Sequence, residues 1–176
     1  MAAHPDPAGE AGPALLAQYD DALPQVYGYL AARVGSTAVA EDLTSETFLA
    51  AVDAIRRGTL TVPTVAWLIG VARHKLVDHW RAQGRDERRL TAVAGQSSID
   101  DPWDVQLDVL VAHAVLAQLG AHHRSALTLR YLDGLPVPEV AVVLDRTVHA
   151  TEALLVRARA AFRSVYEHTH AGGADA

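Results

Sequence analysis

The chain has 176 residues, of which half are hydrophobic, 20% are charged and none is cysteine. This composition is typical of a folded protein, and the absence of thiols excludes disulfides, thiolate metal sites and cysteine nucleophiles. The formal net charge of −6 is unevenly distributed: residues 1–60 and 100–145 each sum to −5, whereas residues 61–99 sum to +3 and residues 146–176 to +1. This balance argues against indiscriminate coating of DNA but permits two local basic faces.

The N-terminal stretch does not have the composition of a targeting segment. Residues 1–13 hold three prolines, two glycines and two acids but no lysine or arginine, so we expect a loose tail rather than a secretory signal. No run approaches the roughly 18 apolar residues that span a bilayer. We therefore expect a cytoplasmic protein that does not insert into a membrane.

Apolar residues recur at helical spacing along most of the chain, and no alternating strand pattern persists. Pro24 is expected to bend or split the first helix, and Ser36 or Thr37 to cap the second. The expected helices span residues 14–34, 38–57, 66–83, 104–118, 121–132, 136–144 and 148–166.

Residues 84–103 lose this period and contain glycines, serines and an Asp-Pro pair, which is typical of a linker. The sequence therefore predicts an all-α protein with two helical lobes, residues 14–83 and 104–168, joined by a flexible linker. A second loose tail is expected at residues 169–176.

The C-terminal lobe carries a helix-turn-helix pattern, a short helix followed by a tight turn and a longer helix that bears arginines. In this arrangement the N-terminal end of the second helix faces base edges in the major groove. Glutamate can accept from cytosine, threonine can contact a polar edge or a thymine methyl, and arginines can hold phosphates. Two packed helices with solvated arginines are the alternative interpretation. The residues expected at DNA are Arg146, Thr147, His149, Thr151, Glu152, Arg157 and Arg159.

The helix expected over residues 38–57 carries an acidic stripe. Asp42, Glu46 and Asp53 share one side with Leu49, and the apolar residues lie largely on the opposite side. A solvated face is one interpretation of this pattern. An exposed leucine among carboxylates also suits docking against a basic partner helix.

The helix expected over residues 66–83 is basic on one side. Its apolar row includes Trp80, with Trp67 beside it, and both tryptophans are favoured as core residues. A basic helix that follows a Thr/Pro loop can hold phosphates and unstacked bases. The polar side bears Arg73, His74, Asp78, Arg81 and Arg85.

Catalytic and metal sites are not indicated by the spacing of the side chains. His74 and His79 do not share a helix face, and two adjacent histidines further along point apart. Neither Ser45 nor Ser125 has an evident His or Asp partner, and the sequence contains no phosphate-binding glycine loop. We predict that the protein is not an enzyme and needs neither metal nor cofactor.

Taken in order, these motifs resemble the bacterial extracytoplasmic-function (ECF) sigma factors. The resemblance covers roughly residues 15–166 and rests on the segments YGYLAARVGSTAVAEDLTSETFLAAVDAI and WLIGVARHKLVDHWR, a polar linker, and a helix-turn-helix ending in LLVRARAAFR. It implies a subunit that directs core RNA polymerase to specific promoters and starts transcription there. The implied partners are the β′ coiled coil and β subunit of the polymerase, promoter DNA and an anti-sigma factor.

The resemblance also implies roles for particular residues. Those implied in polymerase docking are Glu41, Asp42, Leu43, Glu46, Thr47 and Leu49. Those implied in reading and melting the minus-ten element are Thr61, Pro63, Thr64, Trp67, Arg73, His74, Asp78 and Arg81. The helix-turn-helix residues given above would read the minus-thirty-five element, although this chain reads HATEALL where the family usually has a segment like GTVKSRL.

A stand-alone helix-turn-helix regulator is the alternative function. Such a protein would need a dimerisation helix to set the spacing of its half-sites, and no heptad seam is evident. It would also leave the acidic stripe without a role.

Overall fold

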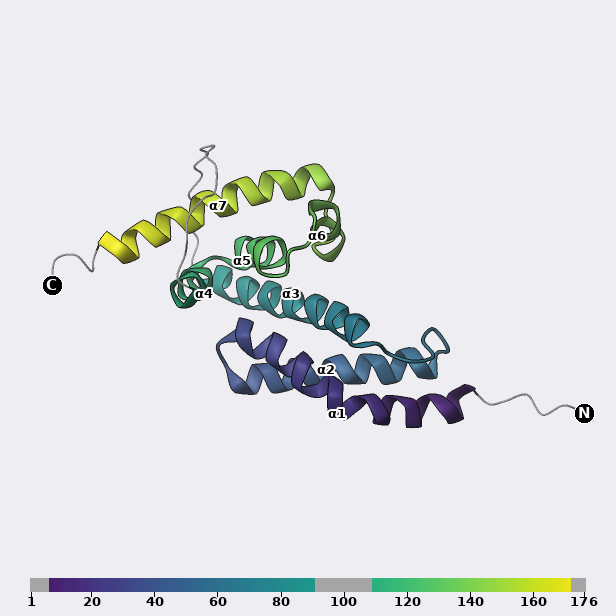
Figure 1. Ribbon diagram of the computed structural model, residues 1–176. Coiled ribbons are helices and arrows are strands. Elements are labelled where there is room, and N and C mark those ends of the chain that lie inside the picture. The colour runs from purple at the N-terminus through teal and green to yellow at the C-terminus, as the bar shows by residue number, and fades with distance from the viewer. Residues whose placement is uncertain (1–6, 91–108, 172–176) are drawn as a thin grey trace, which may run out of the picture. The chain divides into compact units, whose positions relative to one another are not determined.

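The computed structural model describes the backbone of residues 7–90 and 109–171, and the side chains of residues 18–85 and 111–168. Every regular element in these ranges is a helix, which confirms the all-α prediction (Figure 1). The chain forms two compact units, Met1–Leu76 and Val77–Ala176. Their boundary lies inside a helix and not in the predicted linker.

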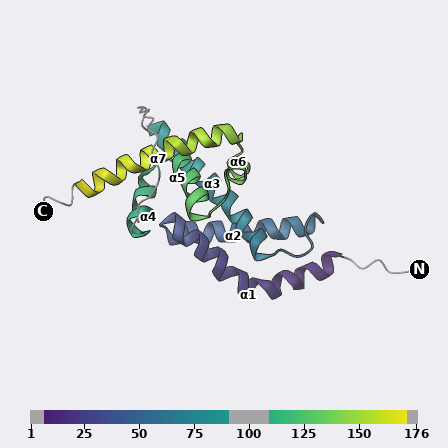
Figure 2. The same ribbon diagram turned by 45° about the horizontal axis from the view of Figure 1, so that its top comes forward.

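The N-terminal unit begins with α1 (Pro7–Val34) and α2 (Thr37–Arg56), which lie side by side in both ribbon views (Figures 1 and 2). α1 begins seven residues earlier than predicted, and it remains one helix through Pro24. A tight turn joins the two helices: Gly35 has a φ of +61°, and the Ser36 hydroxyl accepts from the Val39 backbone N–H at 3.5 Å. Ser36 is therefore the N-cap of α2, and of the two residues that the sequence suggested for this role, Ser36 and Thr37, it is the first.

The core of this unit is formed by one face of each helix. The Tyr19 and Phe48 rings lie 4.8 Å apart between α1 and α2. Removing these side chains from water is the main source of stability for so small a unit. The buried apolar residues are Ala22, Val26, Leu30, Ala40, Leu43, Phe48, Ala51, Ala54, Leu68, Ala72 and Leu76.

Helix α3 (Val65–Leu90) is longer than the sequence predicted. It passes through Gly84 and continues to Leu90, so the first seven residues of the expected linker are helical; the remainder, up to residue 103, lies outside the described residues. The segment after Gly84 has no apolar period because it is almost wholly charged, yet arginine and glutamate are good helix formers. The loss of the amphipathic pattern therefore does not mark the end of the helix.

The C-terminal unit contains the second part of α3 together with α4 (Val109–Gln118), α5 (Ala121–Leu127), a π-helical turn (Thr128–Leu132), α6 (Val137–Val143) and α7 (Val148–Ala171). α7 is the longest of the last four helices and packs against α4, α5 and α6. The common apolar core consists of Val77, Val115, Leu116, Leu119, Ala126, Leu127, Leu129, Val140, Leu144, Leu154, Leu155, Ala158 and Phe162.

The predicted helix-turn-helix is present as α6, a turn and α7. The turn includes Asp145, whose φ of +50° lies in the left-handed region that non-glycine residues seldom adopt. The predicted core side of α7 is confirmed, since Leu154, Leu155 and Phe162 are each 4% exposed. Exposed residues such as His149 and Glu152 lie elsewhere on this helix.

Candidate functional site

The acidic face of α2 is the first candidate surface. Leu49 is 63% exposed, and Asp42 and Glu46 on the same stripe are also exposed. Glu41 is exposed nearby. The stripe is held in place by the packing of the opposite face of α2 against α1, which fixes the direction of these side chains.

Two of the predicted docking residues are not on this surface. Leu43 is 5% exposed and Thr47 is 0% exposed, and the Thr47 hydroxyl donates to the Leu43 backbone carbonyl at 2.7 Å. These two residues belong to the core of the unit and stabilise the helix that presents the stripe. The sequence motif therefore combines surface residues with residues that support them.

Glu46 is tied to the neighbouring helix by an ion pair. The Lys75 Nζ atom on α3 lies 3.0 Å from the Glu46 Oε2 atom, and the two side chains are 36% and 52% exposed. A pair as exposed as this contributes at most about 1 kcal/mol. No ion pair reaches Asp42 or Asp53 within the part of the chain that the structure describes.

The loop before α3 and the first turn of that helix form the second candidate surface. Thr61 is exposed, whereas Pro63 is buried and supports the loop instead of presenting itself to DNA. The Thr64 hydroxyl accepts from the Trp67 backbone N–H at 3.2 Å, so Thr64 caps α3 while remaining exposed. Trp67 is half-buried.

Further along α3 the predicted DNA-contacting residues separate into two groups. Arg73 is half-buried and His74 is exposed, and both lie in the N-terminal unit. Asp78 and Arg81 lie in the C-terminal unit, together with Trp80, which is 2% exposed. The expectation that Trp80 is a core residue is confirmed.

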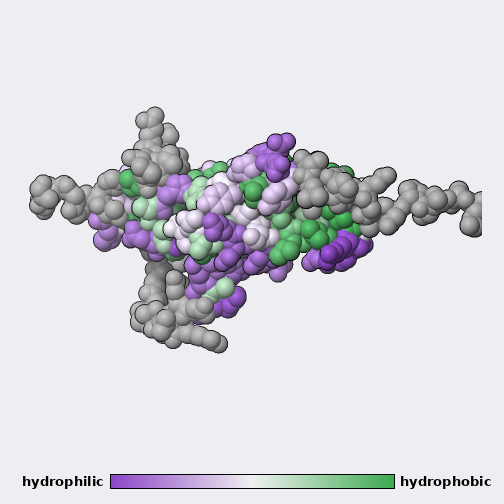
Figure 3. Space-filling model, turned by 90° about the horizontal axis from the view of Figure 1, so that it is seen from below, coloured by the Kyte–Doolittle hydropathy of each residue, from purple (hydrophilic) through white to green (hydrophobic). Residues whose placement is uncertain are grey.

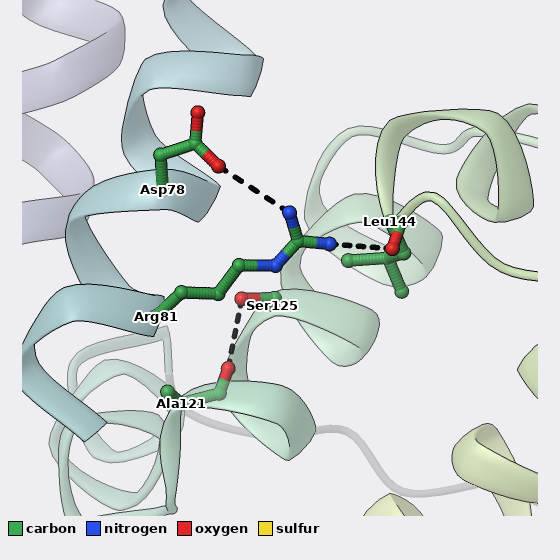
Figure 4. A network of polar contacts seen from close by, with 5 residues as sticks. All are labelled: Asp78, Arg81, Ala121, Ser125 and Leu144. Carbon is green, nitrogen blue, oxygen red and sulfur yellow. Dashed lines mark hydrogen bonds and ion pairs between the residues drawn. The ribbon is translucent and has the colours of Figure 1, made fainter. Parts of the chain in front are cut away.

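Arg81 makes a contact that the sequence did not predict (Figure 4). Its Nη1 atom lies 3.3 Å from the Asp78 Oδ1 atom, and its Nη2 atom donates to the Leu144 backbone carbonyl, 63 positions along the chain. Leu144 closes α6 immediately before the turn of the helix-turn-helix. No local pattern could have shown this contact, because its two residues are brought together only by the fold.

The start of α7 is the third candidate surface. The Thr147 hydroxyl accepts from the Ala150 backbone N–H at 3.2 Å and so caps the helix. Thr151 is 0% exposed, and its hydroxyl donates to the Thr147 carbonyl at 3.0 Å, which corrects its predicted contact with bases. A polar residue at this helical position was predicted to face outward, but its methyl group and its back-bonded hydroxyl suit a buried site.

Five of the predicted residues at this surface are exposed, and a sixth is half-buried. The half-buried residue is Arg159, whose Nη1 atom donates to the Tyr131 hydroxyl at 3.3 Å. Arg157 also acts inside the unit. The pKa of His123 is lowered mainly by the burial of that side chain and secondarily by the positive charge of Arg157. The exposed residues are Arg146, Thr147, His149, Glu152 and Arg157.

The sequence missed two further features of the C-terminal unit. Arg124 donates from Nε to the Leu116 carbonyl at 2.8 Å and from Nη2 to the Leu119 carbonyl at 3.3 Å, so its side chain caps the end of α4. Val142 is 74% exposed and Val148 43% exposed, on either side of the turn. No sequence signal indicated that these two valines would be exposed.

The two serines that were considered as nucleophiles each donate to a backbone carbonyl of their own helix. The Ser45 hydroxyl donates to the Glu41 carbonyl at 2.9 Å, and the Ser125 hydroxyl donates to the Ala121 carbonyl at 2.8 Å (Figure 4). No group of three or more His, Asp or Glu residues is placed to hold a metal among the residues with described side chains. No described helix is long and apolar enough to cross a bilayer, and the face drawn in Figure 3 mixes hydrophilic with hydrophobic residues.

Comparison with known proteins identifies the family of the chain. The model of Sigma-70 region 2 matches residues 18–86, and that of Sigma-70, region 4 matches residues 110–162. The ECF RNA polymerase sigma factor BldN of Streptomyces coelicolor is 37% identical over 151 residues, which are 80% of this chain and 55% of BldN. SigL of Mycobacterium tuberculosis is 32% identical over 151 residues, covering 81% of this chain and 84% of SigL.

The fold is also shared with a solved structure. The sigma factor RpoE of Bartonella quintana, in complex with the anti-sigma factor NepR, aligns with a TM-score of 0.54 at 20% identity, covering 86% of this chain and 96% of that chain. The chain spans little more than half of BldN but most of SigL. With both sigma regions in order and relatives above 30% identity, the chain belongs to the ECF family of RNA polymerase sigma factors.

Proposed function

We propose that the protein is a promoter-specificity subunit of bacterial RNA polymerase, which docks on the core enzyme through α2 and contacts promoter DNA through α3 and α7. The observation that carries the proposal is the face of α2, where Leu49 is 63% exposed beside the exposed carboxylates of Asp42 and Glu46. An apolar centre within charged surroundings is the usual composition of a protein interface. Carboxylates on this face would also steer it towards a basic partner.

Promoter opening needs no catalytic group in this mechanism. Bases that leave the duplex can be held by stacking and by a basic groove, so the energy for opening comes from binding. Two DNA contacts of modest affinity gain strength when both are tethered to the polymerase, because the second contact then forms at high effective concentration. A net-acidic chain can therefore select promoters without binding DNA tightly by itself.

The proposal includes finer assignments for exposed and half-buried residues. Glu41, Asp42, Glu46 and Leu49 contact the β′ coiled coil, while the exposed residues of α7 contact the minus-thirty-five element. An anti-sigma factor that covers the α2 face would control this activity. The residues that contact the minus-ten element are Thr61, Thr64, Trp67, Arg73, His74, Asp78 and Arg81.

The test compares two charge reversals on different helices. Asp42→Lys with Glu46→Lys is expected to lower affinity for purified core polymerase at least tenfold in a pull-down, because both carboxylates then repel a basic partner. The matched control is Asp20→Lys with Asp21→Lys, two exposed carboxylates on α1 with the same change of charge. Circular dichroism checks that each variant is folded.

Run-off transcription with wild-type protein completes the test. Discrete new transcripts from genomic DNA are expected only when core polymerase and the protein are both present. Equal binding by the α2 variant and its control would remove the docking assignment. Salt-sensitive binding of the protein alone to duplex DNA, with no polymerase association, would favour a stand-alone regulator instead.

A further inference from the structure

Gly70 lies inside α3 without a structural reason to be glycine. Glycine is less favourable than alanine within a helix, so a glycine there usually serves a left-handed φ or a close neighbour. The described glycines with a positive φ all lie outside the helices. A β-carbon built on Gly84 would lie 2.9 Å from the Ala121 β-carbon, whereas one built on Gly70 would have no neighbouring atom within 4 Å. Open space therefore lies over the helix backbone at Gly70.

The packing of α3 determines which side chains surround this space. The buried residues in this part of the helix are Leu68, Ala72 and Leu76, each 0% exposed. Residues three or four positions apart are neighbours on a helix surface. Trp67 and His74 therefore border Gly70 on one side. Arg73 borders it on the other side, so the space lies between an aromatic ring and a cation, within the N-terminal unit.

These bordering side chains are of the kinds that hold an unpaired base. Trp67 and Arg73 are half-buried, and His74 is exposed. Aromatic rings and guanidinium planes stack on bases of any sequence, and positive charge holds the adjoining phosphates. A glycine between them allows a ligand to reach the helix backbone itself. The surroundings of Gly70 thus suggest a reason for glycine that its packing does not.

Gly28 in α1 shows that open space alone does not make such a site. It also lies inside a helix, and a β-carbon built on it would have no neighbouring atom within 4 Å. Its neighbours three and four positions away, however, include neither an aromatic ring nor a positive charge. They are Pro24, Gln25, Ala31 and Ala32. Gly28 therefore provides a matched control for Gly70 within the same unit.

We propose that one unpaired base of the minus-ten element lies directly on the backbone of α3 at Gly70, between the Trp67 ring and the Arg73 side chain. The inference rests on the proposed function, in which this part of α3 contacts that element. A methyl group at position 70 would occupy the space of the base and hold it away from the helix. The absence of a side chain is thus itself a feature of the DNA site.

Gly70→Ala separates this role from a role in stability. Alanine favours the helix and meets no neighbouring atom, so the melting temperature should rise by a few degrees. Promoter opening by polymerase that carries the variant should fall about tenfold, since a stacked base contributes at least that much. Affinity for core polymerase should not change. Gly28→Ala should also raise the melting temperature, but it should leave promoter opening as in the wild type.

A second measurement identifies the base. The promoter found by run-off transcription is prepared with each base of the minus-ten element replaced in turn by an abasic sugar. Permanganate reactivity of unpaired thymines then measures open complexes formed by the wild type and by Gly70→Ala. At one position the wild type should lose its advantage, because the base that would meet the added methyl group is missing. At the other positions the advantage should persist.

The outcomes separate this inference from the proposed function. Equal promoter opening by Gly70→Ala and Gly28→Ala would overturn the inference, as would a wild-type advantage that no base removal abolishes. A parallel loss of affinity for core polymerase would also overturn it, since position 70 would then contact the protein partner. Each of these results leaves the proposed function standing. Failure of the wild type to open promoters with core polymerase would instead contradict the proposed function, and the base site with it.

Discussion

The two arginine-bearing helices, α3 and α7, differ in how available their polar faces are. At the start of α7, Arg146, His149 and Glu152 are exposed. In the second part of α3, Trp80 lies in the core and Arg81 is engaged with the end of α6. Helical spacing predicted a polar face on both helices, but the element packed opposite decides whether that face is free. For α3 that element is the helix-turn-helix unit.

The largest expected effect comes from removing the buried ring of Trp80, which lies in the C-terminal unit and has the Arg124 guanidinium 5.7 Å from its centre. Trp80→Ala should lower the free energy of unfolding of that unit by about 3–5 kcal/mol, the usual cost of deleting a buried aromatic side chain. Urea unfolding gives the magnitude, and hydrogen exchange of α5 and α7 amides shows where stability is lost. The half-buried Trp67→Ala should cost less. Unchanged exchange in α5 and α7 would show that the Trp80 ring does not stabilise the C-terminal unit.

A smaller effect is expected from the exposed end of α7. Glu152→Gln should replace a preference for cytosine at one promoter position by a preference for adenine, because glutamine pairs with adenine whereas glutamate accepts from cytosine. Each such contact discriminates by about 1–3 kcal/mol. Selection of promoter sequences by the assembled polymerase measures the preference. Glu167→Gln, near the other end of α7, should leave the selected sequence unchanged, and an unchanged sequence with Glu152→Gln would remove the base contact.

The two capping threonines allow α3 and α7 to be compared with the same substitution. Thr64→Ala and Thr147→Ala should each lower the free energy of unfolding by about 1 kcal/mol, because each removes a hydroxyl that accepts from the first turn. Serine at either position keeps the hydroxyl and should retain most of that stability in the same unfolding measurement. Loss of promoter opening in a serine variant of unchanged stability would show that the threonine methyl contacts DNA.

The smallest effect concerns pH. Burial and, secondarily, the charge of Arg157 lower the pKa of His123, so the unfolded chain binds this proton more readily than the folded chain does. The contribution of His123 to stability should therefore be fully present above pH about 6.5 and should decline as the pH falls below that value. His123→Gln should flatten this part of a stability-against-pH curve. An unchanged slope would show that His123 is not the group responsible.

Features set by neighbouring residues could be predicted from the sequence. The Ser36 cap, the two faces of α2 and the core side of α7 depend on local spacing, and the structure has each of them. The contact of Arg81 with Leu144 depends on a fold that joins distant positions, so no pattern revealed it.

Two other misses have local causes. The end of α3 was placed too early because a charged helix end has no apolar period. Thr151 was assigned to the surface because helical spacing does not show how deeply a small polar residue sinks between neighbours.

The ion pair between Lys75 and Glu46 has a practical consequence, because Lys75 is the only lysine in the chain. Reductive methylation with ¹³C-formaldehyde would label one side-chain amine besides the α-amino group and keep its positive charge. The resulting methyl resonance would come from a cation held 3.0 Å from a carboxylate of the α2 face. Occupation of that face by any partner could then be followed in solution by one NMR signal, without altering a residue.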